Sequence, residues 1–392
     1  MSIAYVVIAA AAALGGYAFL VYPALLRLFA ARHAEGRPGQ AHEPPPTVTV
    51  TVPVHNEEGQ IEGALESLLA LEYPADRLRI LIVSDGSSDR TEEIVRSFAG
   101  RGVELLALPR RVGKTAAEEA ALREIRSEIV LNTDASTRLH PGALRALAAA
   151  FADPDIGVAS GRDVSVGPDG AEGNEGESGY VGYEMRVREL ETRVGGIVGA
   201  SGCCYAIRSS LHRLPLPTGL SRDFAAALRA REHGYRAVSV DEATCSVPRT
   251  ASLRLEYRRK VRTMVRGMRT LVHKRALLNP FRYGAFAWML WSHKVARWGL
   301  PWAALVALLA TGVLAVHHLW ARVVIGVALA LGVATLLAWA RDGKVPPAIG
   351  LPAWVVLGNL AAVHATVKAA GGGQSAIWEP TRRDPAATAE AA

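Results

Sequence analysis

Polar and acidic residues stand at the ends of three short apolar runs that have the composition of strands. They are His55, Asn56 and Glu57 after the first run, Asp85 after the second, and Asp134 and Ser136 after the third. In sheets whose strands alternate with helices, ligands bind at the carboxyl ends of the strands. One carboxylate at such an edge can accept hydrogen bonds from a base or a ribose, and another can hold a divalent cation that neutralises a diphosphate.

A basic turn, Arg110-Arg-Val-Gly-Lys114, precedes a helix-like segment. Its charges and the free N–H groups at the start of that helix suit a phosphate. The turn is not a P-loop, because the Gly-x-x-x-x-Gly-Lys spacing is absent. Ser88 and Asp89 have a simpler explanation than ligand binding, since either can cap the helix that begins near Thr91.

The elements that must position these residues alternate between strand-like and helix-like runs. The predicted strands are 47–54, 78–84, 103–108 and 129–133, and the predicted helices are 60–71, 91–98 and 115–126. This alternation predicts an α/β domain with a mostly parallel, Rossmann-like sheet and helices on both of its faces.

Membrane segments are expected as well, because 50% of the 392 residues are hydrophobic and only 21% are charged. That balance excludes a disordered chain, and the three cysteines exclude a disulfide-rich scaffold. The segment Ile3–Leu28 is too long and too poorly flanked for a cleaved signal peptide, so we predict a retained anchor. Basic residues follow this anchor and none precedes it, which places the next domain in the cytoplasm by the positive-inside rule.

The composition becomes apolar again after the α/β domain. We predict an N-terminal transmembrane helix at 1–30, a linker at 31–46, the cytoplasmic domain at 47–253, interfacial helices at 254–299, transmembrane or re-entrant segments at 300–370 and a cytoplasmic tail at 371–392. Four spans would put that tail outside, whereas Lys368, Arg382 and Arg383 favour the inside. We therefore expect the last segment, 347–367, to be re-entrant; the alternative is that 281–298 also crosses. Trp378 in the tail is expected to dock on the cytoplasmic domain.

Nine basic residues and one acid, Glu256, crowd the junction between the domain and the membrane segments. The basic residues are Arg254, Arg258, Arg259, Lys260, Arg262, Arg266, Arg269, Lys274 and Arg275. Few aromatic residues interleave with them, so nucleic acid is not the expected partner. An amphipathic helix on anionic lipid is, with Val261, Met264, Val265, Met268 and Leu271 on its apolar side.

The chain resembles the membrane-embedded family 2 glycosyltransferases, which have the GT-A fold, over about residues 47–271 and the membrane segments that follow. The motifs that carry the resemblance are Pro53-Val-His-Asn-Glu-Glu58, Ser84-Asp-Gly-Ser-Ser-Asp89, Gly113-Lys114, Thr133-Asp-Ala-Ser136, Gly199-Ala-Ser-Gly-Cys-Cys-Tyr-Ala-Ile-Arg208 and Ser221-Arg-Asp-Phe224. None is specific alone, but their order along the chain is.

The resemblance implies a role for each matching residue. On the donor side, the residues that would bind the nucleotide-sugar are Val54, His55, Glu57, Asp85, Lys114, Asp134 and Arg259. Asp134 and Ser136 would hold a divalent cation, Mg or Mn, although Ser136 replaces the second acid of the family's Asp-x-Asp motif. Arg262 matches the arginine that binds the diphosphate, while Arg259 and Thr263 replace the Gln and Trp of the Gln-x-x-Arg-Trp motif.

On the acceptor side, Asp223 matches the catalytic acid that removes the proton of the acceptor hydroxyl. The alternative is that Asp223 caps the helix 224–233. The residues that would contact the acceptor are Ser201, Gly202, Tyr183 and Glu184. For Tyr183 and Glu184, a position on a surface helix without contact to the acceptor is an equally weighted interpretation.

The implied function is inverting transfer of a sugar from a UDP-sugar to a growing cell-surface polysaccharide or glycolipid, at a multi-pass bacterial-type inner membrane with the catalytic domain in the cytoplasm. The implied partners are the UDP-sugar donor, a polysaccharide or lipid-linked acceptor, membrane lipid, and a second copy or an accessory secretion subunit. Two alternatives remain: transfer of a single sugar to a lipid carrier, and a catalytically inactive nucleotide-binding scaffold of a synthase.

Overall fold

The structure is a computed structural model that describes residues 2–32, 44–166, 175–248, 252–342 and 345–372. The chain divides into two compact units, which are described separately below. The α/β unit comprises the described residues within 32–249, and the helical unit comprises those within 1–31 and 250–373. Most of the linker at 31–46, and the tail with Trp378, lie outside the described residues.

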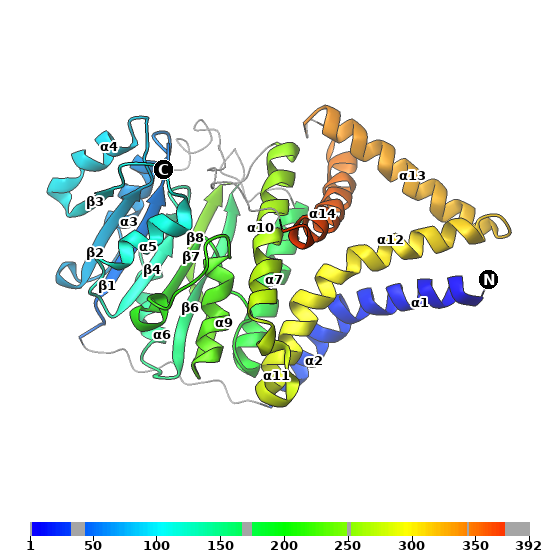
Figure 1. Cartoon of the computed structure of the whole chain (residues 1–392), viewed down its shortest axis with the longest axis horizontal. Helices are drawn as coiled ribbons and strands as arrows, with labels where there is room; N and C mark the ends of the chain where they lie inside the picture. The colour runs from blue at the N-terminus through cyan, green and yellow to red at the C-terminus, as the bar shows by residue number, and fades with distance from the viewer. Residues whose placement is uncertain (1, 33–43, 167–174, 249–251, 343–344, 373–392) are drawn as a thin grey trace. The chain divides into compact units, whose positions relative to one another are not determined.

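The α/β unit is built on a mixed sheet of eight strands in its described part (Figure 1). The strands are β1 (Val48–Val54), β2 (Leu78–Ser84), β3 (Val103–Ala107), β4 (Ile129–Thr133), β5 (Arg138–Leu139), β6 (Ile156–Val166), β7 (Cys204–Arg208) and β8 (Arg236–Pro248). Their order is β3-β2-β1-β4-β7-β6-β8-β5. Four neighbouring pairs are parallel, and the antiparallel pairs are those made by β7 and β5.

Helices cover both faces of this sheet because its central strands are apolar on both sides. On one face, alternate residues of β1 such as Val50 and Val52 pack with α3 (Ile61–Leu69), α4 (Thr91–Ser97) and α6 (Ala143–Ala150). On the other face lie α5 (Lys114–Leu122), α8 (Ser209–His212) and α9 (Arg222–Glu232). The predicted strands and helices of residues 47–133 are confirmed to within a few residues.

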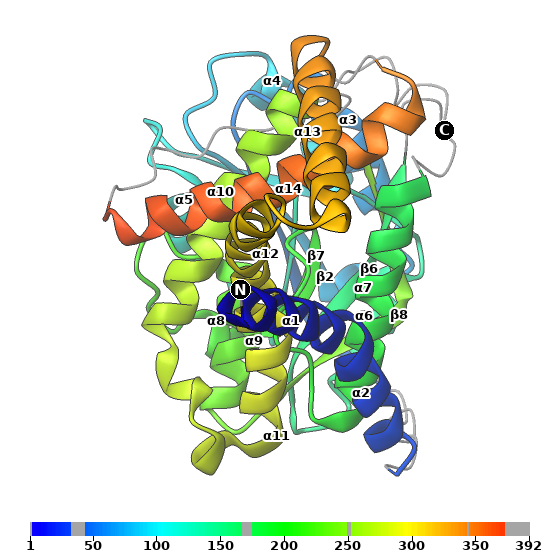
Figure 2. The same ribbon diagram turned by 90° about the vertical axis from the view of Figure 1, so that its right-hand side faces the viewer.

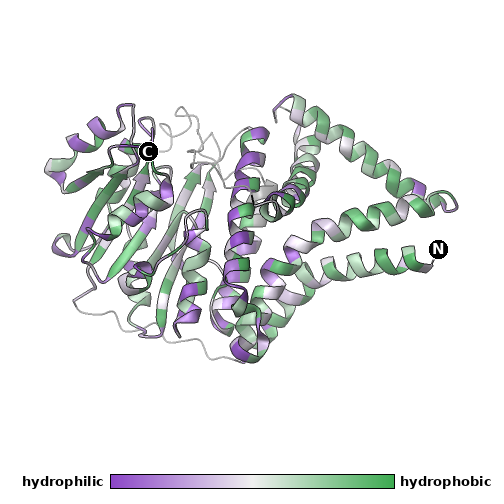
Figure 3. Ribbon diagram, viewed as in Figure 1, coloured by the Kyte–Doolittle hydropathy of each residue, from purple (hydrophilic) through white to green (hydrophobic). Residues whose placement is uncertain are grey.

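Within its described residues, the helical unit contains four helices that are long and apolar enough to cross a membrane: Ser2–Ala30, Pro280–Leu314, Leu319–Ala340 and Ala348–Ala370. Figure 3 shows the apolar character of these helices against the polar α10 (Leu253–His273). The first of the four membrane-length helices comprises α1 (Ser2–Gly16), a π-helical turn (Tyr17–Val21) and α2 (Tyr22–Ala30). The last two correspond to α13 (Leu319–Ala340) and α14 (Pro347–Ala370). The predicted N-terminal anchor therefore forms a helix of membrane-spanning length.

The segment 281–298, expected to lie at the interface, is part of a longer helical path. It runs through α11 (Pro280–Leu290), a π-helical turn (Trp291–Val295) and α12 (Ala296–Leu314), with a break in α11 at Gly284, whose φ is +51°. Helix α1 packs along α12, and α14 packs against α10 and α13 (Figures 1 and 2). The segment expected to be re-entrant is one continuous helix, α14, with Pro352 inside it.

Helix α10 begins at a capped N-terminus, where the Ser252 side chain accepts a hydrogen bond from the Leu255 N–H. Its predicted apolar side is confirmed, but the partner differs from the expected lipid. Val261, Val265 and Met268 pack against Ala361 and Ala365 of α14. Small alanines on α14 allow this close packing, so a helix takes the place that lipid was predicted to occupy.

Candidate active site

Strand order places the strand ends that carry the predicted ligand residues side by side at one edge of the sheet. Strand β1 lies between β2 and β4, and it is parallel to both. The chain leaves β1 toward β2 on one side and later returns to β4 on the other, so β1 and β4 form a topological switch point, the usual place for a ligand in such sheets. His55, Asp85 and Asp134 follow the ends of β1, β2 and β4.

Asp85 holds the basic turn in place through its buried carboxylate. Its Oδ1 accepts a hydrogen bond from the Val112 N–H at 2.6 Å, and its Oδ2 accepts one from the Gly113 N–H at 2.8 Å. Gly86 is required beside it, because its φ is +62° and a Cβ atom there would lie 2.7 Å from the Arg111 nitrogen. The carboxylate predicted to meet a base or ribose therefore also shapes the turn that precedes Lys114.

The residues after β1 are tied to the residues after β2. His55 Nδ1 donates a hydrogen bond to the Asp85 carbonyl oxygen at 2.8 Å. Asn56 adopts a left-handed conformation with a φ of +54°, and its Oδ1 accepts from the Ser88 N–H at 2.8 Å. Two neighbouring strand ends thus form one hydrogen-bonded rim. Val54 is fully buried below it, and Glu57 is half-buried.

The capping explanation for Asp89 fits the structure. Its Oδ1 accepts hydrogen bonds from the Thr91 N–H at 3.0 Å and from the Thr91 hydroxyl at 2.5 Å. Its Oδ2 accepts from the Glu58 N–H at 3.1 Å. Asp89 is therefore occupied in stabilising the start of α4 and the loop after β1.

Lys114 is a cation surrounded by carboxylates near the end of β4. It is the first residue of α5, and its ammonium forms an ion pair with Asp134. Burial alone would lower the pKa of Lys114. The carboxylates of Asp134, Glu118 and Asp223 outweigh burial and raise that pKa above its usual value, so Lys114 stays charged.

Asp223 lies in the first turn of α9 and faces a glycine. The Ser221 hydroxyl donates to Asp223 Oδ1 at 2.5 Å. A Cβ atom built on Gly202 would lie 3.1 Å from Asp223 Oδ2. Ser221 is the N-cap residue of α9, yet its side chain makes no capping hydrogen bond. The alternative prediction was that Asp223 caps α9. In the structure Ser221 occupies the N-cap position, and the hydrogen bond to Asp223 Oδ1 comes from the hydroxyl of that serine and not from a backbone N–H.

A buried ion pair that the sequence reasoning missed lies beside Asp223. Arg222 Nε is 3.2 Å from Glu118 Oε2, and these side chains are only 5% and 7% exposed. Glu118 is four residues after Lys114 on α5, so the two share a helix face. The position of Glu118, one helical turn after the predicted phosphate-binding lysine, was the sequence signal that could have predicted this ion pair.

The glycine-rich segment before β7 is fixed by Ser201 rather than left open. The Ser201 hydroxyl donates to the Asp163 carboxylate, whose oxygens lie at 2.6 and 2.8 Å, and it accepts from the Cys203 N–H at 3.1 Å. Ser201 is 3% exposed. This geometry favours a positioning role for Ser201 and leaves the backbone of Gly202 as the surface beside Asp223.

The remaining predicted residues lie on two helices. Tyr183 and Glu184 are half-buried on α7 (Glu175–Val194), and α7 is tied to the glycine-rich segment by a hydrogen bond from Arg188 to the Gly199 carbonyl oxygen at 2.9 Å. Arg259 and Arg262 lie on α10, in the helical unit. Arg259 makes two hydrogen bonds of 2.8 Å to the buried Glu256.

The donor set for a cation is small. Among the residues that the structure describes, no group of three or more His, Cys, Asp and Glu side chains could hold a metal ion. Asp134 is 31% exposed and Ser136 lies two residues on, which gives one accessible carboxylate and one hydroxyl. Mg²⁺ often binds through one or two carboxylates together with substrate phosphates and water, so this pair fits a cation that a diphosphate helps to hold.

Comparisons with known proteins indicate the family of the chain. Residues 49–214 match the family model described as Glycosyl transferase family 2. An N-acetylglucosaminyltransferase of Bradyrhizobium elkanii is 34% identical over 126 residues, which are 31% of this chain and 68% of that protein. The N-acetylglucosaminyltransferase of Rhizobium meliloti (strain 1021) is 34% identical over 176 residues, 43% of this chain and 40% of that protein. The chain matches only 27% to 40% of the length of the first four curated relatives.

A solved structure confirms the fold class. The mannosyltransferase PcManGT from Pyrobaculum calidifontis, in complex with GDP-Man and Mn²⁺, has a TM-score of 0.72 and 23% identity. The likeness covers 93% of this chain and 99% of that one. The expected GT-A fold with flanking membrane-type helices is therefore confirmed.

Proposed function

Because the chain belongs to glycosyl transferase family 2, we propose that it is an inverting membrane glycosyltransferase that uses a UDP-sugar. The acceptor is a growing cell-surface polysaccharide or a glycolipid, and the catalytic unit faces the cytoplasm of a bacterial-type inner membrane. The names of the curated relatives make UDP-N-acetylglucosamine the first donor to test. The observation that carries the proposal is the ion pair between Lys114 and Asp134 at the switch point of the sheet, together with the Asp223 carboxylate, whose charge also raises the pKa of Lys114.

In this proposal Asp223 is the general base. Its Oδ1 is engaged by Ser221, so Oδ2, on the side of Gly202, takes the proton of the acceptor hydroxyl. The acceptor oxygen then forms a bond to C1 of the sugar as the bond from C1 to the diphosphate breaks, with inversion at C1. The negative charge that develops on the departing UDP is stabilised by the Lys114 ammonium and by N–H groups at the start of α5.

The other predicted residues complete the donor site. Val54, His55, Glu57 and Asp85 line the nucleotide end, where the rim joining β1 and β2 is pre-organised by hydrogen bonds. Arg262 and Arg259 are proposed to bind the diphosphate. Asp134 and Ser136 would hold a Mg or Mn ion, which when bound would neutralise charge on the diphosphate. Gly202, Tyr183 and Glu184 are proposed to line the acceptor side.

An Asp223→Asn variant tests the assigned base. The full-length protein in detergent or nanodiscs is incubated with UDP-sugars and Mn or Mg, and UDP release is measured. Loss of a general base lowers the rate by about 10²–10⁴-fold, so the variant is expected to lose at least about a hundredfold in kcat. Glu232→Gln, at the other end of α9, is the matched control and should keep full activity.

Two results would contradict the proposal at different levels. Full activity in Asp223→Asn would remove Asp223 as the base but leave the enzyme in place. If wild-type protein binds UDP yet releases none from any UDP-sugar with either metal, the chain is a nucleotide-binding scaffold instead. Product length then distinguishes polymer synthesis from transfer of one sugar.

A further inference from the structure

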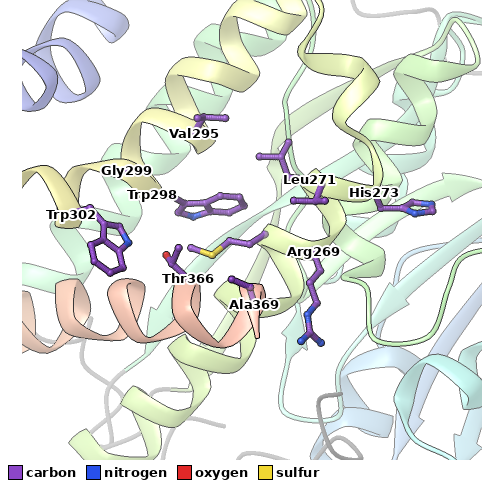
Figure 4. A pocket seen from close by; sticks show the side chains of 12 residues that line it. Arg269, Leu271, His273, Val295, Trp298, Gly299, Trp302, Thr366 and Ala369 are labelled. Atoms are coloured by element: carbon purple, nitrogen blue, oxygen red, sulfur yellow. The ribbon is translucent and has the colours of Figure 1, made fainter. Parts of the chain in front are cut away.

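The helical unit contains a cavity of about 690 Å³ between α10, α12 and α14 (Figure 4). Its walls are mostly apolar: Met268 and Leu271 come from α10, Trp298 and Trp302 from α12, and Ala369 from α14. Sites for small molecules typically measure about 300–1,000 Å³. The cavity is therefore large enough for a ligand, and its walls suit a hydrocarbon chain.

The cavity lies beside the start of α12 and the end of α14. Residues 298–302 are in the first two turns of α12, and residues 366–370 are the last turn of α14. Two tryptophans one turn apart are typical of the membrane–water interface, where an aromatic ring meets both lipid tails and head groups. Lys368, in the last turn of α14, is a basic residue at the same end. A ligand in this cavity would thus be an interfacial amphiphile.

Polar groups at the cavity indicate the chemistry of the ligand's other end. Arg269 and His273 belong to its lining, on a helix rich in basic residues. Trp302 Nε1 is buried and has no hydrogen-bond partner among the described residues. Figure 4 shows the indole nitrogen of Trp302 on the side of the ring nearer Thr366 and Trp298. Arg269 and His273 lie at the other end of the lining from Trp302, so the charged end of a ligand is expected there and not beside Trp302 (Figure 4).

We propose that this cavity binds one acyl chain of an anionic phospholipid from the surrounding bilayer. The chain lies against Trp302, Trp298, Met268 and Leu271, and the anionic head group lies beside Arg269 and His273 at the other end of the cavity. Basic side chains near a membrane surface favour anionic over zwitterionic lipid. This site does not depend on sugar transfer, so it stands or falls separately from the proposed enzyme activity.

A pair of glycine substitutions on one helix tests the site. A Cβ atom on Gly299 or on Gly312 would meet no other atom within 4 Å, so both positions of α12 accept a larger side chain. Gly299 lines the cavity, and Gly312 does not. Gly299→Leu fills the cavity, whereas Gly312→Leu is the matched control with the same added bulk and the same gain in helix propensity.

Lipid retention is measured by native mass spectrometry on the full-length protein, after exchange into detergent containing either phosphatidylglycerol or phosphatidylcholine. Wild type and Gly312→Leu are expected to retain one phosphatidylglycerol, and Gly299→Leu is expected to lose at least tenfold in occupancy. Equal retention in the two variants would overturn the site. Equal retention of the two lipids by wild type, or displacement of the lipid by free glycerol phosphate, would overturn the anionic phospholipid as the ligand.

A measurement on wild-type protein covers the case in which Gly299→Leu does not fold. Phosphatidylglycerol with a photoreactive group in its acyl chain is added to the protein in nanodiscs, and labelled peptides are mapped. Labels are expected in 268–273, 295–302 and 366–370. Labels confined to the outer surfaces of α1 and α13 would show that lipid contacts the unit only as bulk solvent, and the proposal would fail.

Discussion

The buried ion pair between Glu118 and Arg222 can be tested by a double-mutant cycle. The variants are Glu118→Leu, Arg222→Met and the combination of the two. Both side chains are nearly inaccessible to water, with 7% and 5% exposure, and Nε lies 3.2 Å from the carboxylate oxygen. Either single change leaves one charge buried without this partner, whereas the double change leaves two apolar side chains of similar size in contact.

The expected magnitude follows from the burial of both groups. Breaking a buried ion pair by removing one partner destabilises a protein by about 3–5 kcal/mol, while replacing both partners by apolar residues is often neutral. In a unit of this size each kcal/mol lowers Tm by about 2–4 °C, so the single variants should lose about 6–20 °C. The double variant should lie within a few degrees of wild type. Thermal unfolding of the full-length protein in detergent, followed by intrinsic fluorescence, measures all four proteins.

An exposed ion pair in the same unit provides the control. Arg101 Nη1 lies 2.5 Å from Glu66 Oε1, but the two side chains are 50% and 52% exposed. Exposed pairs contribute little because water screens them, so Glu66→Gln should leave Tm nearly unchanged. If the two single variants at Glu118 and Arg222 also leave Tm unchanged, or if the double variant is as unstable as their sum, the pair does not couple α5 to α9 and the reasoning fails.

Three further predictions concern the same unit. Gly202→Ala places a methyl group 3.1 Å from Asp223 Oδ2 and should lower kcat about tenfold with little change in Tm. Gly100→Ala is the control, because a Cβ atom there meets nothing within 4 Å, and it should change neither kcat nor Tm. Equal kcat values in the two variants would contradict the predicted role of Gly202. Burial and two arginines lower the pKa of His212 to about 3, so protons bind the unfolded chain more tightly. Stability should therefore fall as the pH drops from about 6.5 toward 3, by roughly 2 kcal/mol at pH 5, and His212→Gln should remove that part of the slope in thermal unfolding scans. EDTA should abolish UDP release and Mn should restore it, with Asp134→Asn needing at least about tenfold more metal; activity in EDTA would contradict the cation site.

The sequence predicted the part of the fold whose signals are local. Strand β1 alternates valine with threonine or proline, and the polar residues from His55 onward mark its end, so its position could be predicted directly. The position of β4 beside β1 was not predicted, because the rules for parallel strands joined by helices set the handedness of each crossover and do not place β4 next to β1. The two-residue strand β5 carries no such signal, because its pairing with β8 joins residues more than a hundred positions apart.

Contacts between distant segments were the part that could not be predicted. The apolar side of α10 was visible in its spacing, but whether lipid or protein covers it depends on the alanines of α14, about a hundred residues later. Similarly, Ser201 lies in a segment rich in small residues, as expected for a loop that binds a sugar. Only the structure shows that its hydroxyl donates a hydrogen bond to Asp163. In both cases the residue type was informative, while the partner depended on tertiary structure.

Three locally unfavourable features meet at Asp223, and together they support its role without reference to any relative. The N-cap serine of α9 gives up its capping bond and donates instead to the Asp223 carboxylate. Arg222, which directly precedes Asp223, is a buried cation that forms an ion pair with Glu118 on another helix. Gly202 leaves space where any other side chain would press on Oδ2. Departures from local stability rules gather at functional sites, because selection there acts on chemistry rather than on stability. A helix-capping or surface role for Asp223 would require none of the three.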